Sequence, residues 1–196
     1  MINKPRNWNE VKEFSDRPKL PLGAYVCKVK KVALQNNSYG DQLCILFDIA
    51  EGDWRNFYKE EFDSNTQANK KWKGVLRQWL PKDDGSEKDE KTKRAFKSFI
   101  SAFEKSNPGY QFNWDENSLI GKYFGVLYRN EEYSFDDKHG WAVRPYIAIS
   151  TDKARSGDYR LPEDKPLQNK VDDSYASYTE PTNYALLEDD DSEIPF

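Results

Sequence analysis

The sequence has very few of the residues that build metal sites, disulfide frameworks and nucleophilic active sites. Its 196 residues include 2 cysteines and 1 histidine. Cys27 and Cys44 make neither a disulfide framework nor a zinc site, so we interpret them as reduced core residues. The chain also lacks a phosphate-binding glycine motif and any Ser/His/Asp or Cys/His arrangement, and its single His139 stands in a polar stretch. We therefore expect a protein that is not an enzyme and that needs no cofactor or metal.

Long apolar runs are missing as well. Residues 1–6 read Met-Ile-Asn-Lys-Pro-Arg and begin no apolar signal segment. No window approaches the ~20 apolar residues of a membrane-spanning helix. These absences predict a cytoplasmic protein without a membrane partner.

Basic residues are absent from the end of the chain. The chain has 30 Lys and Arg against 34 Asp and Glu, but from Asp172 onward there are 8 acidic residues and no basic ones. Positions 1–171 therefore carry 30 basic and 26 acidic residues, a net charge of +4. A basic body with an acidic tail is typical of a nucleic-acid-binding protein. Aromatic residues make up 15% of the chain, and their flat side chains can stack on bases.

Alternation of apolar and polar residues predicts five strands and two amphipathic helices. We expect the strands at residues 24–34, 41–50, 54–62, 119–133 and 141–151, and the helices at 64–80 and 89–106. The best core candidates share one face of the second strand: Leu43, Ile45, Phe47 and Ile49. The buried face of the fourth strand stays ambiguous, because two alternating sets compete for it: Tyr123, Leu127 and Arg129 against Phe124, Val126 and Tyr128.

The element order β-β-β-α-α-β-β predicts a mainly β fold with a helical insertion. It is the order of a five-stranded OB-fold barrel, a small Greek-key barrel that binds oligonucleotides, although other small barrels and α+β folds share it. The expected domains are an N-terminal arm at 1–19, the barrel at 20–151 with a helical insertion at 63–118, a flexible linker at 152–187 and a disordered acidic tail at 188–196.

The tail ends in an apolar tip that follows an acidic run, Glu188-Asp189-Asp190-Asp191-Ser192-Glu193-Ile194-Pro195-Phe196. Chain ends seldom bury such a tip, so we expect another molecule to hold it. The tail resembles the C-terminal peptide of bacterial and phage single-stranded DNA-binding proteins, in which aspartates precede a terminal Ile-Pro-Phe. Ser192 and Glu193 interrupt that junction here. The first hairpin also resembles phage single-stranded DNA-binding families in its opening, Gly23-Ala24-Tyr25, and its exit, Asp48-Ile49-Ala50-Glu51-Gly52.

This resemblance implies a sequence-independent single-stranded DNA-binding protein for DNA replication, recombination and repair, in the host cytoplasm if a phage encodes it. It also implies that the tail recruits replication, recombination or repair proteins. Phe196 would enter an apolar pocket on the partner with support from Ile194 and Pro195, and Asp189, Asp190 and Asp191 would meet a basic rim. A tethered acidic peptide can also compete with DNA for the protein's own groove. The oligomeric state stays open, a homo-oligomer included.

Sequence-tolerant binding of a single strand needs cations beside exposed aromatic rings along one groove. The non-core faces of the expected strands and the two loops that flank an OB-fold groove supply both kinds of side chain. The candidate DNA-binding residues are Lys28, Lys30, Tyr39, Arg55, Phe57, Lys59, Lys122, Arg129, Tyr133, Phe135, Trp141, Arg144 and Tyr146.

Other interpretations stay open. A second candidate surface consists of Lys70, Lys71, Lys73 and Arg77, although the solvated outer face of a helix that caps the barrel is the favoured explanation. A strand-annealing or recombination-mediator protein could share these features, as could an adaptor whose barrel binds protein. A metal-dependent nuclease would need a carboxylate cluster, for which the candidates are Asp48, Glu51, Asp53, Glu60 and Glu61. Turns and solvated strand faces explain those acids equally well.

Overall fold

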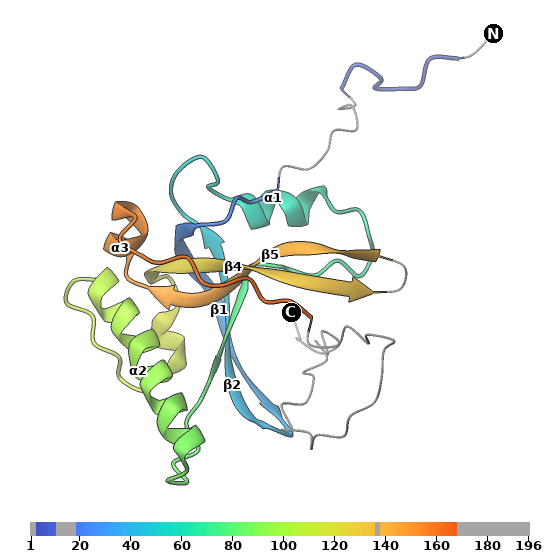
Figure 1. The fold of residues 1–196 in the computed structure, drawn as a ribbon. Coiled ribbons are helices and arrows are strands. Elements are labelled where there is room, and N and C mark those ends of the chain that lie inside the picture. Colours follow the sequence, from blue (N-terminus) through green and yellow to red (C-terminus); the bar gives the residue numbers. More distant parts are fainter. Residues whose placement is uncertain (1–2, 11–18, 136–137, 168–196) are drawn as a thin grey trace, which may run out of the picture.

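Five strands form one antiparallel sheet in the computed structural model, which describes residues 3–10, 19–135 and 138–167 (Figure 1). The strands are β1 (Ala24–Asn37), β2 (Gly40–Ile49), β3 (Val75–Trp79), β4 (Tyr123–Phe135) and β5 (Lys138–Ile149), in the spatial order β3-β2-β1-β4-β5. The helices within these ranges are α1 (Phe57–Ser64), α2 (Glu87–Ser106), the 3-10 helix η1 (Glu116–Leu119) and α3 (Thr151–Ser156). The expectation of a mainly β protein with five strands is confirmed.

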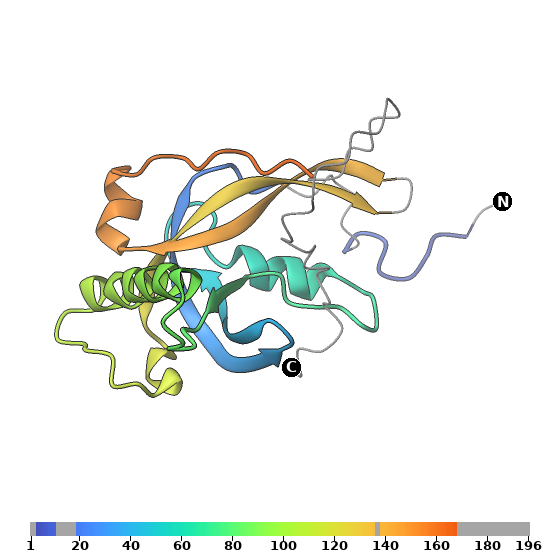
Figure 2. The ribbon, with the colours of Figure 1, turned by 60° about the horizontal axis from the view of Figure 1, so that its bottom comes forward.

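The long strand β1 joins the two halves of the sheet. Its second part pairs with β2 and its first part with β4. The register to β2 shifts between Val29 and Lys31, so Lys30 is the extra residue of a bulge, and bulges bend a strand. The β1–β2 and β4–β5 hairpins consequently diverge from the shared strand, as both ribbon views show (Figures 1 and 2).

The two edge strands, β3 and β5, approach each other without closing the sheet. Some of their Cα atoms lie within 8 Å of one another. No hydrogen-bonded pairing joins them in the part of the chain that the structure describes. The sheet is therefore curled and stays open along one seam, with β3 on one side and the β4–β5 hairpin on the other.

The hydrophobic core lies between the sheet and α2. All four core candidates of β2 are buried: Leu43, Ile45, Phe47 and Ile49. On α2, Phe103 is fully buried and stacks on Phe124 of β4 with the ring centroids 4.5 Å apart. Phe124, Val126 and Tyr128 belong to the core cluster, whereas Tyr123 of the competing set is exposed. Leu127 of that set is buried as well, outside the cluster, so β4 is covered on both faces at this point.

The strand expected at 54–62 is wrong, because this segment forms a turn followed by α1. Asn56 adopts a left-handed backbone conformation with φ at 63° and precedes the helix. The buried carboxylate of Asp48 then accepts hydrogen bonds from the backbone amides of Tyr58 (3.1 Å) and Lys59 (3.3 Å). These bonds satisfy donors that the start of a helix leaves unpaired. Because Asp48 lies on β2, no pattern within 54–62 reveals this cap.

The helix expected at 64–80 is also wrong, because its second half is the strand β3, paired with β2. The spacing of its apolar residues fits one face of a helix, but short apolar runs do not distinguish a helix from a strand. The Gly74 carbonyl accepts a hydrogen bond from the Phe47 amide at 2.9 Å, and a Cβ on Gly74 would lie 2.5 Å from the Phe47 carbonyl oxygen. This close approach holds the segment against β2. The observed order is therefore β-β-α-β-α-β-β, and the insertion at 63–118 contains a strand.

The segment expected to be a linker begins with ordered structure. α3 follows β5 directly and packs on β4, where a Cβ on Gly125 would lie 3.0 Å from the Ala154 Cβ. Farther along, Lys165 forms a parallel bridge with Glu131 of β4. Residues 168–196, which include the acidic tail and its Ile-Pro-Phe tip, lie outside the described residues, as do residues 11–18 of the arm.

Candidate functional site

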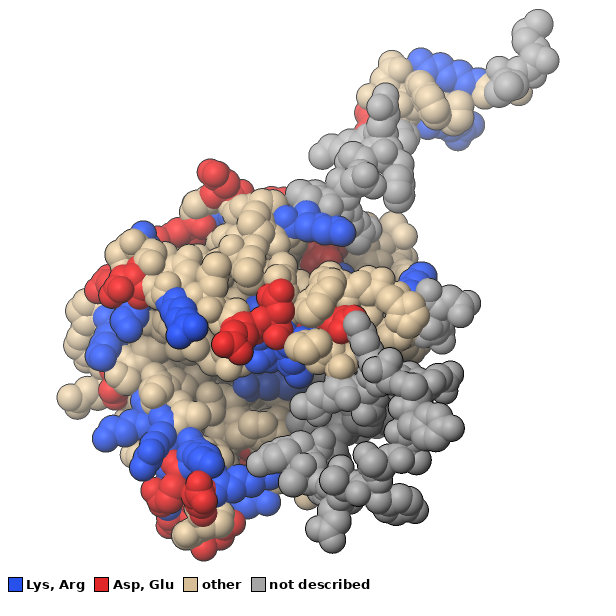
Figure 3. All heavy atoms as spheres, in the orientation of Figure 1, with Lys and Arg blue, Asp and Glu red and all other residues tan. Residues whose placement is uncertain are grey.

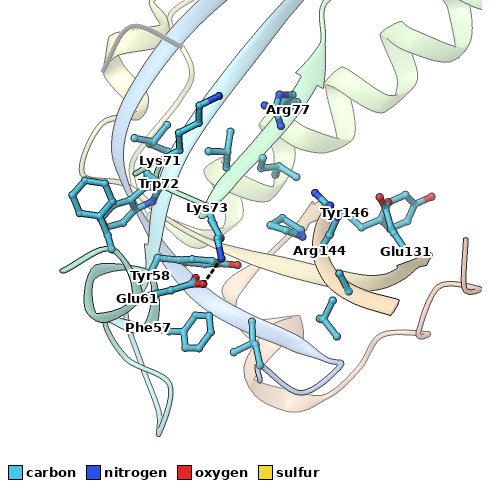
Figure 4. A pocket seen from close by; sticks show the side chains of 18 of the residues that line it. Phe57, Tyr58, Glu61, Lys71, Trp72, Lys73, Arg77, Glu131, Arg144 and Tyr146 are labelled. Atoms are coloured by element: carbon cyan, nitrogen blue, oxygen red, sulfur yellow. Dashed lines mark hydrogen bonds and ion pairs between the residues drawn. The ribbon is translucent and has the colours of Figure 1, made fainter. Parts of the chain in front are cut away.

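An open groove, which we call the seam groove, lies between β3 and the β4–β5 hairpin (Figure 4). Its first wall consists of α1, residues 65–73 and β3, and its second wall consists of the adjoining parts of β4 and β5. The groove has a volume of about 1710 Å³, which exceeds the roughly 300–1,000 Å³ of a small-molecule pocket. This size favours an extended ligand over a compact one.

The first wall is basic. Lys71, Lys73 and Arg77, labelled in Figure 4, come from β3 and the loop that leads into it. Trp72 fixes this loop, because its indole Nε1 donates a hydrogen bond to the Phe47 carbonyl of β2 at 2.9 Å. The cations of the first wall therefore stand on a backbone that is anchored to the sheet.

The second wall carries exposed aromatic rings. Trp141 is 49% exposed, and Tyr133 and Tyr146 are each 38% exposed. Tyr133 lies close over Gly140 on the neighbouring strand, where a Cβ would come 3.0 Å from the Tyr133 hydroxyl oxygen. The absence of a side chain at Gly140 thus allows the ring to lie against the hairpin. By register, Tyr133 leaves the same face of the hairpin as Arg129 and Arg144, whereas Trp141, opposite Glu132, leaves the other face. The second wall therefore offers aromatic rings on both sides of the hairpin.

Two arginines occupy paired positions of the second wall. Arg129 of β4 and Arg144 of β5 are register partners, so their side chains leave the same face of the sheet. The Arg129 guanidinium lies 4.0 Å from the centroid of the Tyr146 ring, which is a cation–π contact. Its Nη2 donates to Glu131 at 2.5 Å, whereas its Nε is buried without a hydrogen-bond partner among the described residues. Arg129 is therefore held in one position in the wall.

Buried phenols tie the two walls together at the base of the groove. The Tyr58 hydroxyl of α1 donates a hydrogen bond to the Tyr128 hydroxyl of β4 at 3.0 Å. Burial is the main cause that raises the pKa of both phenols above its ordinary value. Both side chains are therefore neutral at physiological pH, and the positive charge of the groove comes from Lys and Arg.

The lining as a whole is cationic and aromatic. Its basic residues are Lys19, Lys70, Lys71, Lys73, Arg77, Arg129 and Arg144, and its acidic residues are Glu61 and Glu131, which leaves an excess of five positive charges. Its aromatic residues are Phe57, Tyr58, Phe62, Trp72, Trp79, Tyr133, Trp141 and Tyr146. Figure 3 shows the molecule in the orientation of Figure 1. On this side Lys and Arg side chains lie between the β4–β5 hairpin and the β1–β2 hairpin. Such a lining complements a polyanion that also carries flat apolar groups.

The seam groove brings together six of the thirteen residues predicted to bind DNA: Phe57, Arg129, Tyr133, Trp141, Arg144 and Tyr146. Five of them belong to the β4–β5 hairpin, whose strands the apolar alternation predicts. Phe57 reaches the groove from α1 and not from a strand, and it packs edge-on against Trp54 and Tyr58. The hairpin residues are therefore the larger part of what the sequence identifies.

The remaining seven lie outside the lining: Lys28, Lys30, Tyr39, Arg55, Lys59, Lys122 and Phe135. The Nζ atom of Lys28 lies 5.2 Å from the Tyr123 ring centroid, and that of Lys122 lies 4.5 Å from the Tyr110 centroid. The sequence pattern predicts a strand at Arg55 and Lys59. Arg55 instead precedes α1, and Lys59 lies on α1, where it pairs with Asp63. The other three are exposed. Tyr39 lies between β1 and β2, Lys30 lies at the bulge of β1, and Phe135 lies at the end of β4.

Residues 70–77 are the part of the groove that the sequence interpretation underrates. The favoured explanation, the solvated outer face of a helix, does not hold, because the segment is a loop and a strand. All four basic residues of the second candidate surface line the groove. A usable signal is the run Lys70-Lys71-Trp72-Lys73, which mixes cations with an aromatic ring as single-strand binding sites do.

No group of three or more His, Cys, Asp or Glu is placed to hold a metal ion within the described residues. Both cysteines are buried and free, as expected of core residues. The helices in the described ranges are too short or too polar to cross a membrane.

No protein-family model matches the sequence, and no curated protein matches it. The function of the seam groove must therefore be inferred from its own residues.

Proposed function

We propose that the protein binds single-stranded DNA in the seam groove without reading its sequence. The observation that carries the proposal is the basic wall that faces an aromatic wall across one open groove. Phosphates contact the cations, while unpaired bases stack on Tyr133 and Tyr146 on one face of the β4–β5 hairpin and on Trp141 on its other face. A single strand presents phosphates and free base faces together, whereas a duplex hides its base faces inside the helix.

The strand arrangement supports an OB-fold as the scaffold for this activity. An OB-fold is a five-stranded, partly open Greek-key barrel that binds oligonucleotides between the loops of its first and last hairpins. Here β1 pairs with strands on both sides, and the order β3-β2-β1-β4-β5 leaves β3 and β5 at the two edges. β3 and the β4–β5 hairpin lie on the two sides of the seam, and the β1–β2 hairpin diverges from the β4–β5 hairpin (Figures 1 and 2).

The available interactions suffice for useful affinity. Stacking contributes ~1–3 kcal/mol for each base, so three exposed rings supply roughly 3–9 kcal/mol. A dissociation constant of 1 μM corresponds to about 8.2 kcal/mol. Phosphate contacts add to stacking and make the affinity salt-dependent. None of these interactions distinguishes one base from another, which suits a protein that coats strands in replication and recombination.

The tail supports a second role, the recruitment of replication, recombination or repair proteins. Its match to the Ile-Pro-Phe peptide of single-stranded DNA-binding proteins is the basis for this role. The last described residue, Leu167, lies beside β4, where its amide donates to the Glu132 carboxylate at 3.1 Å. In the sequence 29 residues, 168–196, follow it. A chain of this length spans up to about 100 Å when extended, enough to reach a partner while the groove is occupied.

Titration of fluorescent oligo-dT and of a duplex of equal length tests the DNA-binding proposal. We expect at least ten-fold tighter binding of the single strand, and a plot of log K against log salt with a slope of about −0.7 for each phosphate contacted. The double substitution Lys70→Gln and Lys71→Gln, at two positions of the groove lining, should reduce the steepness by about 1.4. The matched control is Lys88→Gln with Lys91→Gln on α2, outside the groove lining. Absence of oligo-dT binding at low salt would overturn the proposal.

A further inference from the structure

Two carboxylates stand within the otherwise cationic lining of the seam groove, one in each wall. Glu61 lies on α1 and Glu131 on β4. Their side chains are 20% and 22% exposed, so most of each carboxylate-bearing chain is packed into its wall. Charged side chains are seldom covered to this extent unless they are paired. Both carboxylates are therefore fixed parts of the groove walls.

Each carboxylate is paired with a cation of the same groove. Oε1 of Glu61 lies 2.5 Å from Nζ of Lys73 (Figure 4), and Oε1 of Glu131 lies 2.5 Å from Nη2 of Arg129. Oε2 of Glu131 also lies 3.9 Å from Nζ of Lys165, at the bridge to β4. A phosphate that approaches Lys73 or Arg129 therefore meets an anion already in place.

We propose that Glu61 and Glu131 are internal counterions that compete with phosphate for Lys73 and Arg129, and so weaken the binding of single-stranded DNA and keep it reversible. This inference rests on the proposed function of the seam groove. A protein that coats single-stranded DNA and later releases it needs a binding strength below the maximum that the cations could supply. The carboxylates set that strength, because every strand that enters must share two cations with them.

Charge-removing substitutions test the inference. A carboxylate and a phosphate held about 5 Å apart by one cation repel each other in water enough to change an equilibrium constant about four-fold. Glu61→Gln and Glu131→Gln should each tighten oligo-dT binding about four-fold at low salt, and less at high salt because of screening. The slope of log K against log salt should steepen by about 0.7 in each variant, since one more phosphate is fully neutralised. A purely structural role does not steepen this slope.

Glu87→Gln is the matched control. Glu87 also pairs with a lysine, Lys91, but on the exposed surface of α2. The Glu87→Gln substitution changes the net charge by the same amount, and it should leave the affinity for oligo-dT and the slope of log K against log salt unaltered. The inference is overturned if Glu61→Gln and Glu131→Gln increase the affinity for oligo-dT no more than Glu87→Gln does. Weaker binding by these variants would also overturn it, because the carboxylates would then position their cations for DNA. A wild-type protein that fails to bind oligo-dT removes the proposed function and this inference with it.

A double-mutant cycle separates competition from general repulsion. In a Lys73→Gln background, Glu61→Gln should tighten binding by less than in the wild type, because the cation that it releases is gone. Equal gains in both backgrounds would contradict competition at Lys73. Circular dichroism of each variant verifies that the fold is kept. The Glu61 variants keep the test decisive if Glu131→Gln unfolds the protein, because that substitution deprives the largely buried Arg129 side chain of its partner.

Discussion

Replacement of Trp141 by alanine tests the aromatic wall at its most exposed ring. Trp141 lies opposite Glu132 in the β4–β5 hairpin and is 49% exposed, so its loss should cost little folding stability. Stacking of one base on one aromatic side chain contributes ~1–3 kcal/mol, which corresponds to a change of about 5- to 150-fold in Kd. Because about half of the ring already contacts protein, we expect the lower part of this range, roughly 10- to 20-fold.

Fluorescence anisotropy with labelled oligo-dT measures this change, and intrinsic tryptophan quenching reports stacking in the same samples. Trp114→Ala is the matched control, because Trp114 is 81% exposed and lies outside the groove lining. It should bind like the wild type. If both variants bound oligo-dT within two-fold of the wild type, base stacking on the second wall would be refuted.

Three further predictions concern packing and the tail. Gly74→Ala places a Cβ 2.5 Å from the Phe47 carbonyl oxygen, so it should destabilise the fold by about 1–3 kcal/mol and lower the melting temperature by several degrees in a thermal scan. Phe103→Ala empties a fully buried site and should cost about 3–5 kcal/mol, measured as a lower midpoint in urea unfolding. Deletion of residues 188–196 should leave oligo-dT binding equal or tighter while abolishing partner capture. Clearly weaker DNA binding by the truncated protein would contradict competition between tail and strand.

The second wall can be predicted from the sequence because it depends on local patterns. In the β4–β5 hairpin, residues two apart share a face, so the alternation of apolar and polar residues indicates which side chains lie together. Arg144 and Tyr146 reach the candidate list from this alternation in the expected fifth strand. Tyr133 reaches it as a residue of the loop that flanks an OB-fold groove, and the alternation of the fourth strand leaves the face of Arg129 ambiguous. The same alternation predicts the face of β2 on which Phe47 is fully buried, although Cys44, Leu46 and Asp48 on its other face are buried as well.

The first wall cannot be predicted in this way, because contacts between distant residues decide its conformation. α1 begins where Asp48 of β2 accepts hydrogen bonds from the Tyr58 and Lys59 amides, ten or more residues away. β3 forms where Gly74 meets the backbone of Phe47, which lies 27 positions earlier. Neither contact leaves a periodic trace in residues 54–80. The choice between helix and strand in this segment is therefore made by β2 and not by the segment itself.

A ligand that spans the seam groove must couple the two walls, and this coupling can be measured. β3 is an edge strand that pairs with β2 along one side, so its other side faces the groove. Bound single-stranded DNA should slow hydrogen exchange of the backbone amides at 75–79 together with those at 141–146. At a ligand concentration of 100 times Kd, it should also raise the free energy of unfolding by about 2.7 kcal/mol. Protection of the β1–β2 hairpin around Tyr39, with none at 75–79, would locate the DNA outside the seam groove. In that case the basic wall would have to be explained as a solvated surface after all.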